Sequence, residues 1–165
     1  MPLTRINNLG ITDGTIVNAD IATAAAIATT KLGAGAVLQV VSATVGQTDL
    51  SADGYVGSGA SITPSSTSNK ILVMVDGYTE KISGTSTAYA ETELHRATTF
   101  ISELNNATQY QYTVAARVPF SINYLDSPNS TSSTQYRIYH DEISLGATYR
   151  YYQYVITLLE IKAWL

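Results

Sequence analysis

The chain holds one compact cluster of acid and base side chains, His140-Asp141-Glu142. In a strand, successive side chains point to opposite faces, so His140 and Glu142 would share a face and Asp141 would take the other. A catalytic dyad or a metal site built on this cluster needs further ligands from distant strands, and the sequence marks none. A solvated strand end explains the cluster as well, so both interpretations stay open.

A second polar group, His95-Arg96, comes shortly after Glu91 and Glu93. A ladder of opposite charges between neighbouring strands accounts for this spacing as well as a reactive site does. Among the hydroxyl groups, the segment Gly57-Ser58-Gly59 lacks the GxSxG spacing of a nucleophile elbow. These patterns are weak evidence for catalysis.

Cysteine is absent from the 165 residues, which excludes disulfides, thiolate chemistry and cysteine-based zinc sites. No glycine-rich phosphate loop or calcium-loop spacing is present. We therefore expect no enzymatic activity, no cofactor and no metal, and we expect stability to come from packing or from oligomerisation.

Tyrosine dominates the aromatic residues, with 12 copies against two phenylalanines and one tryptophan. Its ring offers apolar area and its hydroxyl one polar group, which suits recognition of a receptor such as a sugar. Strict alternation would place Tyr152 and Tyr154 on one face of their strand and Tyr149 and Tyr151 on the other. The alternative is that the tyrosines fill the inner faces of a sandwich and a subunit interface. The candidate receptor surface consists of Tyr124, Asp126, Asn129, Tyr152 and Tyr154.

Charged residues make up only 13% of the chain, and the net charge is -4. A basic stripe that could follow a phosphate backbone is absent, so we expect no nucleic acid partner. We also expect no membrane insertion and no signal peptide, because the apolar stretches are short and the N-terminus lacks a leader pattern. A surface rich in Ser, Thr, Asn and Tyr is compatible with a large subunit interface, or with a neutral surface that has no partner.

The elements that would position these residues are strands, because apolar residues alternate with a period of two from residue 36 onward. The segment 70–80 is apolar on both faces, which predicts a central strand. Pro119 marks a bend, a bulge or an edge strand within the run 109–123, and residues 125–135 read as a loop. The spacing predicts an antiparallel β-sandwich or jelly roll over residues 36–165. Further strands are expected at 36–45, around Tyr55 and Ile62, at 89–96, from Tyr136, and in two runs over 147–163.

Residues 1–35 have a different spacing of apolar residues, which predicts an arm in front of the β-domain. Their large apolar residues are too sparse to bury one another, so copies from neighbouring chains or a docking partner would have to cover them. The segment 18–32 predicts a short helix, and Gly33-Ala34-Gly35 reads as a hinge. The docking and oligomerisation residues of this arm are Ile11, Ile16, Ile21, Ile27 and Leu32.

The segment 11–21 resembles a repeat of small bacteriophage tail fibre proteins, above all those of phages that infect cyanobacteria and marine bacteria. The repeat has the form I-x-D-G-x-I/V-x-x-A-x-I, and Ile11-Thr12-Asp13-Gly14-Thr15-Ile16 opens the match. The segments 70–77, 120–139 and 156–163 resemble the β-sandwich heads of the same fibres. The resemblance implies a homotrimer whose N-terminal arm binds a virion tail or baseplate protein, while the head faces the host surface.

These observations favour a virion structural protein, a short tail fibre that is assembled in the host cytoplasm and attaches to a host-surface glycan. The first alternative is a decoration fibre on the capsid head or neck, built from the same arm and head. The second is a spike that degrades polysaccharide. Canonical glycoside cleavage needs a pair of carboxylates, for which Asp141/Glu142 and Glu91/Glu93 are the candidates.

Overall fold

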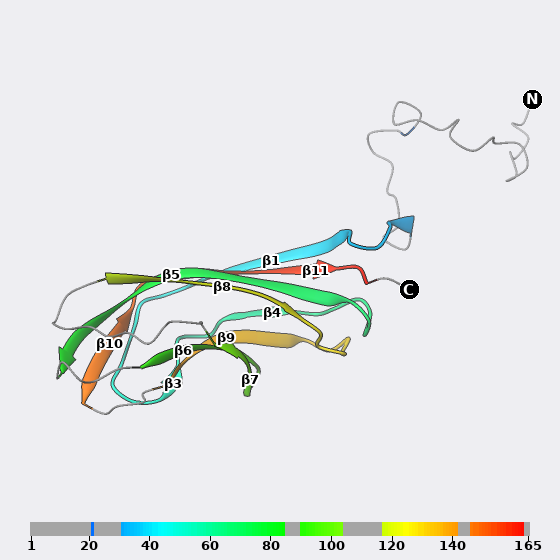
Figure 1. Cartoon of the computed structure of the whole chain (residues 1–165). Coiled ribbons are helices and arrows are strands. Elements are labelled where there is room, and N and C mark those ends of the chain that lie inside the picture. Colours follow the sequence, from blue (N-terminus) through cyan, green and yellow to red (C-terminus); the bar gives the residue numbers. More distant parts are fainter. Residues whose placement is uncertain (1–20, 22–30, 85–89, 104–116, 142–145, 164–165) are drawn as a thin grey trace, which may run out of the picture. The chain divides into compact units, whose positions relative to one another are not determined.

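The expected alternation appears as strands throughout the computed structural model, which describes residues 21, 31–84, 90–103, 117–141 and 146–163. Two antiparallel sheets result (Figure 1). The mainly β prediction is therefore confirmed. The strands are β1 (Val37–Val45), β2 (Thr48–Leu50), β3 (Gly54–Tyr55), β4 (Ala60–Ile62), β5 (Lys70–Gly84), β6 (Glu91–Arg96), β7 (Thr99–Glu103), β8 (Arg117–Asp126), β9 (Thr134–Asp141), β10 (Ala147–Tyr151) and β11 (Tyr154–Ile161).

The chain divides into two units, Met1–Leu32 and Gly33–Leu165. Of the first unit only Ile21, Lys31 and Leu32 are described, so the predicted helix over 18–32 and three of the predicted arm residues, Ile11, Ile16 and Ile27, lie outside the described residues. Ile21 is exposed and Leu32 is half-buried. No helix in the described ranges is long and apolar enough to cross a bilayer.

Sheet A has four strand positions, and two of these positions each hold two strands that follow one another. The order is β1 and β2, then β11 and β10, then β5, then β8. The strand β5 is long enough to pair with both β11 and β10 along one side, and β8 pairs with it along the other. Likewise β1 pairs with β11 and β2 with β10. As predicted, residues 70–80 form a central strand, and Pro119 lies in β8 at the edge of the described sheet.

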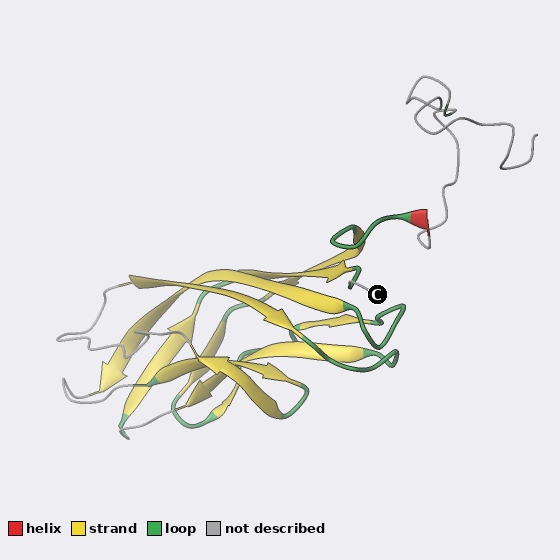
Figure 2. Ribbon diagram, turned by 45° about the vertical axis from the view of Figure 1, so that its right-hand side comes forward, coloured by secondary structure: helices red, strands yellow, loops and turns green. Residues whose placement is uncertain are grey.

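Sheet B repeats this arrangement with β3/β4, β9, β6 and β7. Along the chain the strands move back and forth between the two sheets, and the resulting order is that of a jelly roll. Figure 2 shows the two layers from a second direction, with strands making up most of the described chain. The sandwich prediction over the head is confirmed at this level.

The two sheets face each other across one hydrophobic core. Sheet A contributes Val73 and Ile156, and sheet B contributes Leu94 and Ile138, all with no exposed surface. Every second residue of each strand points inward, so the core follows directly from the alternation. The remaining face of each sheet points outward and is free to carry function.

The alternation of inward and outward side chains is interrupted at two places that the sequence pattern does not predict. Tyr152 and Gln153 separate β10 from β11, which pair one after the other with the same side of β5, and one extra residue lies between Tyr151 and Val155, so Tyr149, Tyr151 and Tyr154 are all buried on the inner side. The predicted pairing of Tyr152 with Tyr154 on one face is therefore wrong. A register shift between Val37 and Gln39 likewise turns Val37 outward. In both cases an extra residue shifts the strand by one position.

The incoming chain is fixed to the end of β11. The Gly35 amide donates to the Lys162 carbonyl at 2.8 Å, and the Lys162 amide donates to the Ala36 carbonyl at 2.9 Å. Because β1 begins directly after Ala36, we call this end of the sandwich the arm end. The arm end is where residues 1–32 join the head.

Beside the arm end, the buried carboxylate of Glu160 holds three segments together. Its oxygens accept hydrogen bonds from the Ser65 amide and hydroxyl, both at 2.7 Å, from the Asn69 amide group at 2.6 Å and from the Gln39 amide group at 2.7 Å. Burial by itself raises the pKa of Glu160, but these hydrogen bonds together outweigh burial and the pKa lies below its ordinary value. The carboxylate therefore stays charged and satisfied.

Candidate functional site

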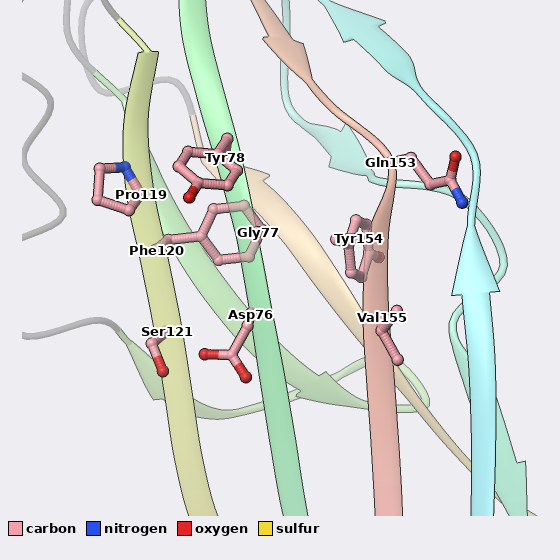
Figure 3. Close-up of a pocket in the computed structure, with 9 residues that line it drawn as sticks. All are labelled: Asp76, Gly77, Tyr78, Pro119, Phe120, Ser121, Gln153, Tyr154 and Val155. Carbon is pink, nitrogen blue, oxygen red and sulfur yellow. The ribbon is translucent and has the colours of Figure 1, made fainter.

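The outer face of sheet A is hollowed where β10 ends and β11 begins. The hollow has a volume of about 590 Å³ and lies over Gly77 in β5 (Figure 3). Strand pairing assembles it, because both Ser121 of β8 and Val155 of β11 lie opposite Asp76 of β5. Its volume falls within the range of small-molecule sites. The lining residues are Asp76, Gly77, Tyr78, Pro119, Phe120, Ser121, Gln153, Tyr154 and Val155.

The strand β5 passes close over two aromatic side chains at Gly77. A β-carbon at this position would lie 2.6 Å from Cζ of Phe120 and 2.8 Å from Cβ of Tyr154. Those two rings meet edge to face, with centroids 5.9 Å apart. An aspartate-glycine pair such as Asp76-Gly77 is typical of a hairpin turn, and a glycine inside a strand is typical of a bulge. Instead the pairing of β5 with β8 has no register shift, and the groups that approach are side chains.

The rim of the hollow combines one aromatic ring with short polar groups. The Tyr78 side chain is 53% exposed, so its ring is available for stacking. Asp76 can only accept hydrogen bonds when ionised, whereas Ser121 and Gln153 can both donate and accept. This set of groups matches a sugar, which presents an apolar ring face and hydroxyl groups. Asp76 is the only carboxylate among the lining residues, and canonical glycoside hydrolysis requires two.

The five candidate receptor residues do not share one surface. Tyr154 is 2% exposed, donates its hydroxyl to the Val56 carbonyl at 2.7 Å and contributes to the hollow from below. Burial raises the pKa of this tyrosine above its ordinary value. Tyr152 is half-buried; its hydroxyl donates to the Glu80 carboxylate, and the Arg117 guanidinium lies 4.1 Å from its ring centroid.

The other three candidate residues lie elsewhere, on β8 and on the loop that follows it. Asp126 is buried and accepts hydrogen bonds from the Tyr136 hydroxyl at 2.6 Å and from Arg96 at 2.8 and 2.9 Å. Tyr124 packs partly buried against the core, and Asn129 is exposed with a φ of 50°. Asp126 therefore acts as an internal ion-pair partner in this structure, where its sequence position had suggested a loop surface.

The outer face of sheet B carries a different cluster, in which the side chains bind one another. The His95 ring stacks on Tyr139 with centroids 4.7 Å apart, and its Nε2 lies 2.6 Å from the Glu93 carboxylate. Arg137 lies over the Tyr55 ring at 3.6 Å. Burial first, and then nearby carboxylates, raise the pKa of Tyr139. The aromatic rings of this cluster are those of Tyr55, His95, Phe100 and Tyr139.

Three carboxylates meet beside this cluster. Oxygen atoms of Glu91, Glu93 and Asp141 lie within 4.8 Å of one another, because β6 and β9 place Glu91 opposite Asp141. The structure thus brings together acids from both groups that the sequence singled out. An all-oxygen set of this kind suits Ca²⁺ or Mg²⁺, but Glu93 is already bound by His95.

His140 turns away from these acids into the core. It has no exposed surface, and its Nδ1 lies 3.0 Å from the Tyr151 hydroxyl, which in turn lies 3.0 Å from the Thr92 hydroxyl. Burial lowers the pKa of His140 to about 4, so the ring is neutral at pH 7. The solvated strand end that the sequence allowed is wrong for His140. Glu142 lies outside the described residues.

Comparisons with known proteins leave the function open. No protein-family model matches the chain, and no curated protein matches it in sequence. The structure of infectious bursal disease virus Gt strain is 9% identical, with a TM-score of 0.46 over 78% of this chain and 39% of that chain. T=1 particles derived from infectious bursal virus are 7% identical, with a TM-score of 0.41 over 76% and 36%.

A third solved structure, dimeric latent PorU from Porphyromonas gingivalis, is 8% identical, with a TM-score of 0.38 over 79% of this chain and 14% of that chain. The chain thus spans less than two fifths of the length of each of these proteins. TM-scores below 0.5 at such identities assign neither a family nor a function to the chain.

Tyr78 and Asp76 were not among the site residues predicted from the sequence. Both lie in the segment 70–80, whose apolar character predicted burial on both faces. One sequence feature could have indicated these site residues: an acidic residue, a glycine and a tyrosine follow one another within the otherwise apolar central strand. A glycine there indicates close approach of another group.

Proposed function

We propose that this chain is a virion attachment protein whose jelly-roll head binds a neutral sugar of the host surface in the hollow over Gly77. The observation that carries the proposal is the hollow itself, where an exposed tyrosine ring stands beside three short polar side chains. Asp76 would accept a hydroxyl hydrogen bond and would repel acidic sugars, which favours uncharged ligands.

The viral part of the proposal rests on the resemblance of residues 11–21 to bacteriophage tail fibres. In the homotrimer which that resemblance implies, the arm holds the protein on a virion tail or baseplate protein and three heads face the host. A single sugar site of this size binds weakly, so attachment would depend on avidity between several heads. Labelling of virions with an antibody to the head separates a tail fibre from a capsid decoration.

Binding of the purified full-length chain to an array of neutral, acetamido and acidic oligosaccharides tests the proposal. We expect selective binding of a neutral or acetamido sugar, and a loss of at least about tenfold in affinity for Tyr78→Ala, equivalent to about 1.4 kcal/mol. Ser121→Ala is expected to weaken the same binding by a smaller factor.

Phe100→Ala serves as the matched control, because Phe100 is a similarly exposed aromatic residue on sheet B, 49% exposed against 53% for Tyr78. It should leave sugar binding unchanged. Equal losses for Phe100→Ala and Tyr78→Ala, or no binding by the unmodified chain to any sugar of the array, would contradict the proposed site.

A second candidate function is polysaccharide cleavage, which the approach of Glu91, Glu93 and Asp141 favours. Retaining glycosidases place two carboxyl groups about 5–5.5 Å apart, and in this cluster carboxylate oxygens lie within 4.8 Å of one another. Release of new reducing ends from a capsular polysaccharide, abolished by Glu91→Gln, would support cleavage. Binding without cleavage supports the attachment function.

A further inference from the structure

Four aliphatic side chains form a row across the outer face of sheet A, close to the arm end. Strand register sets them side by side: Val40 opposite Leu159, Leu159 opposite Leu72, and Leu72 opposite Leu125. Val40 is 59% exposed and Leu125 is 55% exposed, at the two outer strands of the sheet. Three further apolar residues adjoin these four: Val37 and Met74, which are both exposed, and Ile161, which is half-buried. We call these seven residues the aliphatic row.

The aliphatic row borders uncharged polar residues on the side of Met74 and two lysines, Lys70 and Lys162, at the arm end. The next positions along the sheet are Ser42, Thr157 and Asn123, which flank Met74. At the arm end, Lys70 is engaged with the Ser127 hydroxyl at 2.6 Å. A contiguous apolar patch rimmed by polar groups is typical of a protein interaction surface. Water-exposed sheet faces usually carry polar side chains instead.

The arm begins at the edge of the same patch. A groove of about 460 Å³ beside the aliphatic row is lined by Leu125 and Ile161 of the row together with Gly35, Ser68, Lys70, Lys162 and Ala163. The chain therefore leaves the head next to its exposed apolar surface, and 32 residues of the first unit continue from this point. If copies of the arm associate, their heads are held together with the aliphatic rows close to one another. The occupant that this arrangement favours is a second copy of the chain.

We infer that the aliphatic row is the surface by which the head packs against a second copy of itself. The hollow over Gly77 lies on the same face but farther from the arm end, where Asp76 and Ser121 replace aliphatic residues. This inference rests on the assembly of several copies that the proposed function includes, and it does not rest on sugar binding.

The absence of cysteine from the chain makes a sharp experiment possible. A variant of the full-length chain that carries both Val40→Cys and Leu125→Cys has one thiol at each outer strand of sheet A. Those strands are three strand spacings apart, roughly 14 Å, whereas a disulfide needs Cα atoms within about 7 Å. Any disulfide in this variant must therefore join two copies.

Under mild oxidation we expect covalent dimers and higher multiples of the 17.7 kDa chain on non-reducing gels. The matched control carries Ser61→Cys and Phe100→Cys, at β4 and β7 on the outer face of sheet B, and should stay uncrosslinked at the same concentration. Equal crosslinking of the two variants, or none in either, would overturn the inference.

Light scattering of the unmodified full chain provides the second measurement. We expect a mass above that of one chain, and a rise of at least tenfold in the dissociation constant for Leu125→Glu with the circular dichroism spectrum unchanged. A monomer at high concentration, which would leave the row to a different partner, would overturn the inference. Crosslinking without sugar binding would contradict only the sugar site, and sugar binding without crosslinking would contradict only the interface.

Discussion

The outer faces of the two sheets differ in how their side chains are used. On sheet B the side chains of the outer face bind one another and are largely shielded: His95 stacks on Tyr139 and bonds to Glu93, and Arg137 covers the Tyr55 ring. On sheet A, Tyr78, Val40 and Leu125 are each more than half exposed. Both faces belong to strands of one sandwich, so the fold alone does not cause the difference.

The difference indicates which of the two outer faces gains more from contact with a partner. A face whose charges and rings are mutually paired gains little from further contact, because each group already has an interaction to lose. A face with exposed aliphatic rows and an open tyrosine ring gains by burying them. This contrast supports the proposals that place recognition and assembly on sheet A, whereas the contacts within the cluster on sheet B contribute to local stability.

The largest effect is expected on the stability of the fold, from protonation of His140 in the core between the two faces. The two faces can therefore be compared only at a pH where the sandwich stays folded. Burial lowers the pKa of His140 from its ordinary value of 6.5 to about 4 in the folded chain, so the stability that the neutral ring contributes is fully present above pH 6.5. As the pH falls from 6.5 to 4 the unfolded chain gains a proton that the folded chain does not, and about 3 kcal/mol of stability is lost. The charge of Asp53 opposes the shift and is weaker than burial.

Urea unfolding at pH 7.5, 5.5 and 4.5 measures this loss. His140→Gln should unfold with a smaller dependence on pH over that range, although it is less stable at pH 7.5. The same pH dependence in both proteins would show that other groups cause the acid sensitivity.

The second prediction tests the close approach under the hollow. Gly77→Ala places a β-carbon against Phe120 and Tyr154, and overpacking of this kind costs about 1–3 kcal/mol. Propensity alone predicts the opposite sign, since alanine in a strand is better than glycine by roughly 0.5–1 kcal/mol. The matched control is Gly46→Ala, because no atom lies within 4 Å of the added β-carbon there. Thermal unfolding that ranks the two variants in the reverse order would contradict the geometry.

The smallest effect is expected on sheet B. His95→Ala removes the ring that stacks on Tyr139 and the partner of Glu93, which should cost about 1–2 kcal/mol of stability. It should leave sugar binding and crosslinking through Val40→Cys and Leu125→Cys unchanged. Denaturant titration gives the first quantity, and the array and gel assays give the others. A loss of sugar binding without loss of stability would move the recognition site to sheet B.

Local patterns predicted most of the strands. The segment 70–80 is a central strand as expected, short strands occur at Tyr55 and Ile62, and the loop after residue 126 lies where the composition placed it. Alternation is a property of a few neighbouring residues, so it can be read without knowledge of the partner strands. The homotrimer, the arm helix and the arm residues stay predictions.

The candidate site could not be read in the same way. The hollow joins Asp76, Ser121 and Gln153 from three separate segments, and the five tyrosine and loop residues selected from the sequence proved to lie in different places. The one-residue break at Tyr152 and Gln153 was enough to turn Tyr154 into the core.

The sequence by itself determined that this chain forms a cysteine-free, antiparallel sandwich of strands with a chemically distinct leading segment. Only the tertiary structure decided which strands pair, and therefore which side chains meet across them. The alignment of Val40 with Leu125 across four strand positions and the opening over Gly77 both depend on register. Register is set by closure of the whole sandwich, because a slip of one residue exchanges the inner and outer faces of a strand.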